Sequence, residues 1–108
     1  MNANPVSIAL GALSDPTRRA IFERIVAAPS AVGDLAREFP VSRPAVSQHL
    51  RVLKQAGLVV DQAEGTRRVY RAHAPTLDLL RTYFDRFWTD ALTSFTEAAE
   101  RPTRKTHG

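Results

Sequence analysis

The spacing of apolar side chains between Ser42 and Gly57 constrains the fold more than any other feature of this sequence. On a helix that turns by about 100° per residue, Val46, Leu50 and Leu53 share one side and form a stripe that needs burial. Ser42 is a favourable N-cap residue, and Gly57 suits the left-handed position that follows the end of a helix. The pattern predicts an amphipathic helix that starts after Ser42 and ends before Gly57.

The opposite side of this helix carries small, polar and cationic side chains. Glutamine can pair bidentately with adenine, arginine can pair with guanine, and serine can contact a base or a phosphate. Arg43 and Lys54 lie at the border between the two sides, from which long side chains reach phosphates. The pattern favours a helix that reads the major groove of DNA over a merely solvated helix face. The residues expected to contact DNA here are Ser42, Arg43, Pro44, Ser47, Gln48, Arg51, Lys54 and Gln55.

The positive charge of the chain is concentrated around this helix. The formal net charge is +4, and the segment from Ser42 to Arg71 holds six basic and two acidic residues, which is the whole excess. A local cationic surface of this kind suits contact with phosphates. His49 lies close to the apolar stripe, and we expect a packed, hydrogen-bonded histidine there rather than a base contact.

Apolar spacing predicts further helices at about Val6–Leu13, Pro16–Ala27, Val32–Phe39 and Thr76–Glu100, with Asp15 as the N-cap of the second. The third of these and the helix after Ser42 are joined by a tight connection, which is the helix-turn-helix pattern.

A β-hairpin is predicted after Gly57. Leu58–Val60 and Arg68–Arg71 are rich in residues that favour strands, and they flank a polar stretch with one glycine, which predicts a multi-residue loop. We expect Arg67 and Arg68 at the tip of this hairpin, in contact with a DNA groove or with phosphates. The fold class is therefore mainly α with a small β-hairpin, a winged helix-turn-helix in the order α-α-α-α-β-β-α. Residues 1–100 form one domain, and 101–108 form a basic, disordered tail.

The last predicted helix carries most of the aromatic side chains in the chain. An aromatic surface this broad would be a liability on a monomer, so we expect a homodimer through the terminal helices rather than simple coverage of the core. The residues expected at the interface are Val6, Leu10, Leu80, Tyr83, Phe84, Phe87, Trp88, Ala91, Leu92 and Phe95.

These motifs, in this order, resemble the ArsR/SmtB-type winged-helix repressors, which are dimeric bacterial transcription regulators. The resemblance extends from about Leu10 to Phe95. It implies that the helix after Ser42 enters the major groove, that the hairpin contacts flanking DNA and that the terminal helices form the dimer. The motifs that carry it are Leu13–Arg19, Asp34–Ala36, Ser42–Leu50, Ala56–Val59 and Gly65–Tyr70.

The sequence departs from the metal-sensing members of that family. It has no cysteine, and its three histidines, His49, His73 and His107, are far apart and lie outside the final helix. We therefore expect no metal and no cofactor, as in a cysteine-free branch with an aromatic final helix. The absence of cysteine also excludes a disulfide scaffold and a cysteine nucleophile.

Composition and motifs favour a metal-independent repressor that binds an inverted-repeat operator as a homodimer. Two alternatives stay open: a repressor released by an organic ligand, a pH change or a protein partner, and a winged helix used for protein interaction only. No glycine-rich phosphate loop or catalytic constellation indicates an enzyme. Neither a signal sequence nor a long apolar segment is visible, so we expect a cytoplasmic, nucleoid-associated protein without a membrane partner.

Overall fold

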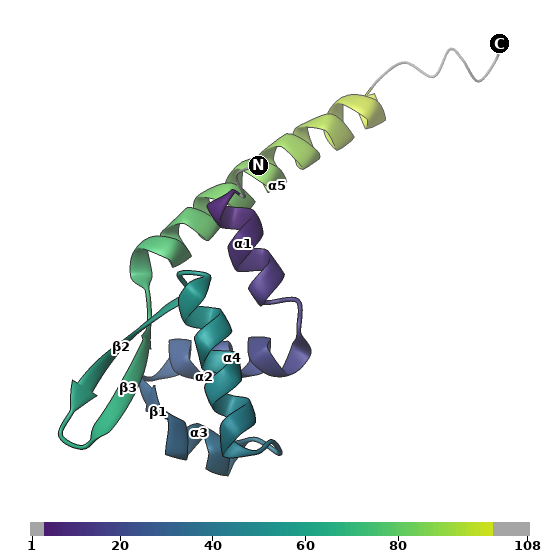
Figure 1. The fold of residues 1–108 in the computed structure, drawn as a ribbon. Coiled ribbons are helices and arrows are strands. Elements are labelled where there is room, and N and C mark those ends of the chain that lie inside the picture. Colours follow the sequence, from purple (N-terminus) through teal and green to yellow (C-terminus); the bar gives the residue numbers. More distant parts are fainter. Residues whose placement is uncertain (1–3, 101–108) are drawn as a thin grey trace.

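The computed structural model describes residues 4–100, and the predicted tail at 101–108 lies outside the described residues. Five helices and a small antiparallel sheet follow one another along the chain (Figure 1). The elements are α1 (Pro5–Ala12), α2 (Pro16–Ala27), β1 (Ser30–Ala31), α3 (Val32–Glu38), α4 (Arg43–Gln55), β2 (Val59–Glu64), β3 (Arg67–Ala72) and α5 (Ala74–Glu100). The winged helix-turn-helix fold is confirmed.

Three helices begin in the same way, with a polar N-cap followed by proline in the first turn. The side chain of Asn4 accepts a hydrogen bond from the Val6 amide at 2.7 Å. The Asp15 carboxylate accepts one from Arg18 at 3.0 Å, and the Ser42 hydroxyl accepts one from the Ala45 amide. These caps satisfy amide groups that have no partner within the helix, so the start of each helix is encoded locally.

Gly57 ends α4 with a φ of +79°, the left-handed conformation expected at this position. Its carbonyl accepts a hydrogen bond of 2.6 Å from the hydroxyl of Thr76, in the first turn of α5. The His73 amide donates to the carbonyl of Leu58 close by, at 2.9 Å. The end of α4 and the start of α5 are thereby tied to each other.

The hairpin is tighter than the sequence suggested. β2 continues to Glu64 and pairs with β3 along its whole length, so the predicted multi-residue loop is wrong and only Gly65 and Thr66 form the turn. Gly65 has a φ of +65°, as two-residue hairpin turns require. Cross-strand ion pairs, including Arg71–Glu64 at 2.7 Å, stabilise a strand whose polar composition resembles that of a loop. We call β2, this turn and β3 the wing.

A third strand, β1, was not predicted. Ser30 pairs with Tyr70 and Ala31 pairs with Val69, which gives the sheet order β1-β3-β2. Two residues are too few for an alternating pattern, and their partners lie far along the chain. This short strand anchors one side of the wing to the start of α3.

The core lies between α2, α3, α4 and the wing, and the stripe predicted on α4 is confirmed. Val46, Leu50 and Leu53 are fully buried, together with residues from the other elements. Its further members are Val6, Ala9, Ala12, Ile21, Phe22, Ile25, Leu35, Leu58, Val59 and Leu80.

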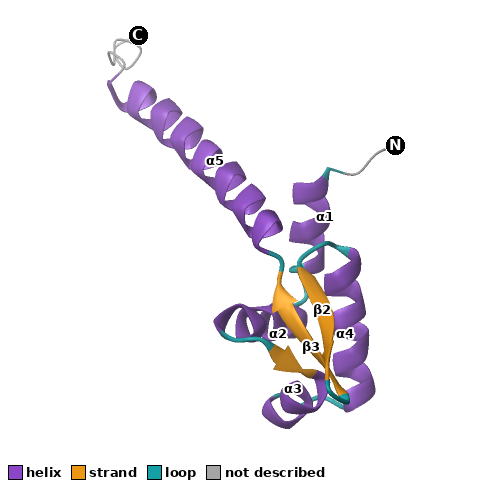
Figure 2. Ribbon diagram, turned by 90° about the vertical axis from the view of Figure 1, so that its left-hand side faces the viewer, coloured by secondary structure: helices purple, strands orange, loops and turns teal. Residues whose placement is uncertain are grey.

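The first turns of α5 lie beside α1, and most of the helix projects away from this body (Figure 2). Leu80 is the only buried residue of α5. Val6 and Leu80, which we expected between two copies, are 9% and 8% exposed within a single chain, so they belong to its own core. They hold α1 and α5 in place instead. Within residues 4–100, no helix is both long and apolar enough to cross a membrane.

Candidate nucleic-acid interface

The helix α4 presents one continuous exposed face. Every side chain predicted to contact DNA on this helix is exposed, while the opposite stripe is buried. We call the exposed side chains Ser47, Gln48 and Arg51 the reading face. None of the three makes a hydrogen bond within the described residues, so their donors and acceptors are available to a partner. Pro44 and Gln55 lie exposed toward the two ends of the same helix.

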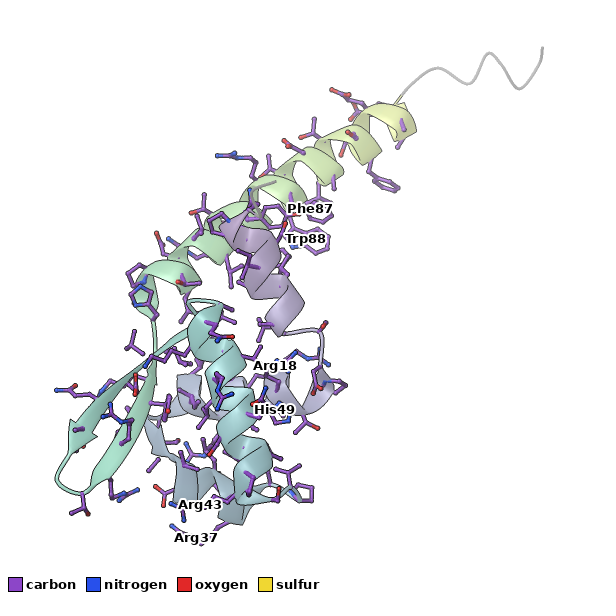
Figure 3. The ribbon with its side chains drawn as sticks, viewed as in Figure 1. Arg18, Arg37, Arg43, His49, Phe87 and Trp88 are labelled. Atoms are coloured by element: carbon purple, nitrogen blue, oxygen red, sulfur yellow. The ribbon has the colours of Figure 1, made fainter. Side chains whose placement is uncertain are left out.

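His49 lies on the side of α4 toward α2, near Arg18 (Figure 3). It is half-buried, as expected, but its buried Nδ1 has no hydrogen-bond partner among the described residues. The predicted hydrogen bond is therefore absent there. The hydrogen bond that the Arg18 amide donates to the Asp15 carboxylate is the main reason that the pKa of Asp15 is lowered, and the electrostatic interaction with His49 contributes to the same effect.

A nearly buried carboxylate connects α4 to the wing. The Asp61 side chain, on β2, is 8% exposed and accepts Lys54 of α4 at 2.7 Å and Arg68 of β3 at 2.9 Å. The hydrogen bond from Lys54 lowers the pKa of Asp61 most, and the Arg68 guanidinium adds to this against the opposing effect of burial. Lys54 and Arg68, both expected to contact phosphate, are therefore already paired in the free protein.

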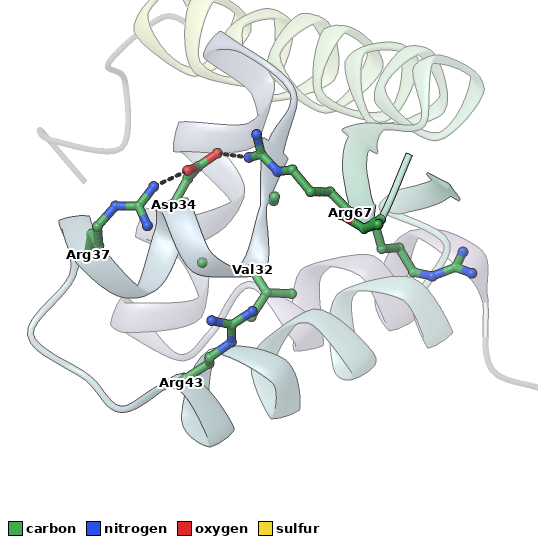
Figure 4. Close-up of a pocket in the computed structure, with 9 residues that line it drawn as sticks. Val32, Asp34, Arg37, Arg43 and Arg67 are labelled. Atoms are coloured by element: carbon green, nitrogen blue, oxygen red, sulfur yellow. Dashed lines mark hydrogen bonds and ion pairs between the residues drawn. The ribbon is translucent and has the colours of Figure 1, made fainter. Parts of the chain in front are cut away.

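Arg67 is also paired. Its guanidinium donates to the carboxylate of Asp34 on α3, which Arg37 contacts on its other oxygen (Figure 4). Arg67 and Arg68 begin β3 rather than occupy the tip, because the turn consists of Gly65 and Thr66 alone. Their expected place at the tip is thus wrong by one or two residues.

These arginines line a pocket of about 550 Å³ between α3, the start of α4 and the wing. We call it the arginine pocket and define it by Arg37, Arg43, Arg67, Arg68 and Asp34. A side chain at Gly33 would meet the guanidinium of Arg43 at 3.6 Å and that of Arg37 at 3.8 Å. Two guanidinium groups therefore converge over one glycine. Some of these cations are predictable from the sequence but the pocket is not, because its parts come from three separate segments.

Arg43 and Arg51 form no ion pair within the described residues. The six cations predicted to form a phosphate-binding surface thus divide into two unpaired and four paired side chains. An ion pair between exposed side chains, such as Arg71–Glu64, contributes little to stability, whereas Asp61 is nearly buried and holds its two partners more firmly. The surface is therefore cationic but partly neutralised by its own aspartates and glutamate.

The sequence profile of a helix-turn-helix domain family matches residues 13–62. One relative is the HTH-type transcriptional regulator Rv2034 of Mycobacterium tuberculosis, 62% identical over 86 residues that cover 80% of each chain. The transcriptional repressor SdpR of Bacillus subtilis is 38% identical over 61% of this chain and 73% of its own. Solved structures of other proteins share the fold of this chain. An ArsR-like transcriptional regulator from Rhodococcus sp. RHA1 is 31% identical with a TM-score of 0.74, covering 91% of this chain and 95% of that one. This chain belongs to the ArsR/SmtB family.

Another ArsR/SmtB-like structure, a possible transcriptional regulator for arsenical resistance, is 41% identical with a TM-score of 0.67 over 86% of this chain and 97% of that one. The relatives are transcriptional regulators rather than enzymes. The chain has no cysteine, and residues 4–100 contain no group of three or more metal-ligating side chains.

Proposed function

We propose that this ArsR/SmtB protein is a sequence-specific repressor that inserts α4 into the major groove of its operator. The reading face carries the proposal, because its side chains are exposed, unpaired and fixed to a helix whose opposite stripe is fully buried. Gln48 and Arg51 supply the amide and guanidinium groups that pair with adenine and guanine. Repression then follows because a protein bound at a promoter excludes the polymerase.

The residues around the reading face have positioning roles in this proposal. Arg43 contacts a phosphate directly, and Arg67 exchanges its carboxylate partner for a phosphate when DNA arrives. Lys54 and Arg68 contact phosphates while they stay paired with Asp61. The Ser42 hydroxyl caps α4, and Pro44 and Gln55 flank the groove. Because its operator lies on chromosomal DNA, the protein would associate with the nucleoid.

We further propose that the protein binds DNA as a homodimer. Six large side chains of α5, from Tyr83 to Phe95, are between 39% and 71% exposed. Neighbouring rings already stack or meet edge to face, as Tyr83–Phe87 and Phe87–Trp88 do. An apolar surface of this extent is typical of an interface, and Leu10 and Ala91 extend it. A two-fold dimer binds an inverted repeat whose half-sites lie one or two helical turns apart, about 34 Å each.

An electrophoretic mobility-shift titration on the DNA upstream of the protein's own gene tests this function. The wild-type protein should bind that duplex more tightly than a scrambled duplex of the same length, with and without a chelator. Arg51→Ala should remove about 1–3 kcal/mol of that preference and leave binding to the scrambled duplex nearly unchanged.

Equal affinity for both duplexes would contradict sequence-specific binding. A fully functional protein carrying Arg51→Ala and Gln48→Ala would instead support a winged helix used for protein interaction.

Release by a small organic ligand is a second candidate function. A pocket of about 300 Å³ lies between α1 and α5, where Leu10, Leu79 and Tyr83 supply apolar walls and Arg86 supplies a charge. Its volume is at the lower end of the range for ligand sites. Thermal-shift measurements with candidate metabolites, followed by the mobility-shift assay, would test whether a ligand that binds here weakens DNA binding.

A further inference from the structure

The arginine pocket holds more positive charge than its own contacts neutralise. Besides Arg68, three arginines and one aspartate line it, which leaves an excess of two positive charges. Arg68 forms an ion pair with Asp61, a carboxylate outside the pocket. Arg43 has no ion-pair partner among the described residues, although its guanidinium lies beside that of Arg37 over Gly33. Like charges held this close favour an anion between them.

Asp34 already acts as such an anion for two of the arginines. Each of its oxygens accepts one guanidinium, from Arg37 on the same helix and from Arg67 on the wing (Figure 4). Burial alone would raise the pKa of the Asp34 carboxyl, but Arg67 and Arg37 outweigh it and leave the pKa below its usual value of 3.8. The carboxylate is therefore ionised at neutral pH. Its side chain is 31% exposed, so another anion can approach the same guanidinium groups.

We propose that the arginine pocket binds one phosphate of the DNA backbone and that Asp34 occupies its arginines as an internal competitor until that phosphate arrives. The inference rests on the proposed function, because it requires α4 to lie in the major groove. Arg43 is the first residue of α4, and Arg67 adjoins the turn of the wing, so the pocket lies between the helix that enters the groove and the wing. A phosphate there would contact α3, α4 and the wing together.

A phosphate of the DNA backbone can take the place of the carboxylate among these side chains. It is a diester, so it offers two charged oxygens, as a carboxylate does, and guanidinium groups bind both anions bidentately. A phosphate that also contacts Arg43 would engage three guanidinium groups, whereas Asp34 engages two. The exposed ion pairs that must be exchanged contribute little on their own. Asp34 should thus lower the affinity for DNA without preventing binding.

Asp34→Asn tests this directly, because asparagine keeps the shape and removes the charge. The variant should bind the upstream duplex and a scrambled duplex roughly tenfold more tightly, by the same factor, since phosphate contacts carry no sequence information. The slope of log affinity against log salt should steepen by up to about 1. The gain should disappear in the Arg67→Gln background if Arg67 is the group that Asp34 releases.

Asp78→Asn is the matched control. It also removes one negative charge from an aspartate paired with an arginine, Arg81, but on α5 and away from the arginine pocket. Its affinity should stay close to that of the wild-type protein, and circular dichroism melting should confirm that both variants fold. An equal gain in both variants would mean that net charge alone is responsible, which would overturn the proposal.

Competition by inorganic phosphate separates DNA from a free anion as the source of the phosphate. At constant ionic strength, replacing chloride with phosphate should reduce the gain of Asp34→Asn on DNA without abolishing it, because free phosphate can enter the same pocket. If phosphate competes specifically and the variant shows no gain on DNA, the pocket binds a free anion and the assignment is wrong. If the wild-type protein binds no DNA, the proposed function fails with it. If Arg51→Ala behaves as expected and Asp34→Asn does not, only this inference fails.

Discussion

Asp61 is the residue through which α4 and the wing contact each other electrostatically. Its carboxylate is nearly buried, while Lys54 and Arg68 remain about half exposed. The two cations therefore keep access to solvent and to DNA even while paired. The arrangement fixes the wing against α4 before any DNA is present.

The lowered pKa of Asp61 makes a prediction for acid stability. A carboxyl group whose pKa is lowered on folding stabilises the folded state above its unfolded value, 3.8, and this contribution is lost as the pH falls through the lowered pKa. Asp61→Asn removes the titrating group, so its urea midpoint should be lower than that of the wild-type protein at neutral pH. The difference should shrink as the pH falls below 3.8. A constant difference across this range would contradict the role assigned to Asp61.

At the scale of elements, the start of α4 depends on one hydroxyl. Ser42→Ala removes the N-cap bond to Ala45 and should lower the free energy of unfolding by about 1 kcal/mol, measured by urea denaturation. Ser47→Ala is the control on the same helix, because Ser47 is exposed and caps nothing. It should leave stability unchanged and weaken binding to the upstream duplex instead. Equal losses of stability in the two variants would contradict this division.

An element is predictable from the sequence when the residues that stabilise it lie close to one another along the chain. The caps at Asp15 and Ser42, the end at Gly57 and the stripe on α4 follow from residues within a few positions of one another. The strand β1 and the length of β2 do not, because their partners are supplied by β3.

The candidate site shows the same dependence on range. The exposed residues of α4 are predictable from the helical period. The contact between Asp34 and Arg67 joins positions 33 residues apart, so no local pattern indicates it. The arginine pocket is therefore a tertiary feature, although each of its arginines is visible in the sequence.

At the scale of the whole molecule, α5 is a helix of 27 residues, about 40 Å long, that buries only one of them. In the proposed dimer, Trp88 and Phe95 should lie between two copies, since they are 56% and 71% exposed in one chain. Trp88→Glu should convert a wild-type dimer into a folded monomer at micromolar concentration, as measured by light scattering. The melting temperature of the wild-type protein should also rise with concentration.

Gln62→Glu, on an exposed position of the wing, adds the same charge and should leave the wild-type assembly intact. A wild-type protein that is monomeric at micromolar concentration would contradict the proposed dimer.

The position of Leu80 also has a consequence for the order in which the protein folds and dimerises during synthesis. Within residues 4–100, every buried apolar side chain lies at or before Leu80, so nothing that emerges later from the ribosome is needed to complete the core. Domains fold as their sequence becomes available, from the N-terminus onward. The winged helix-turn-helix can therefore close while the aromatic half of α5 is still inside the exit tunnel of the ribosome. Each chain would meet a partner only after its DNA-contacting half had formed.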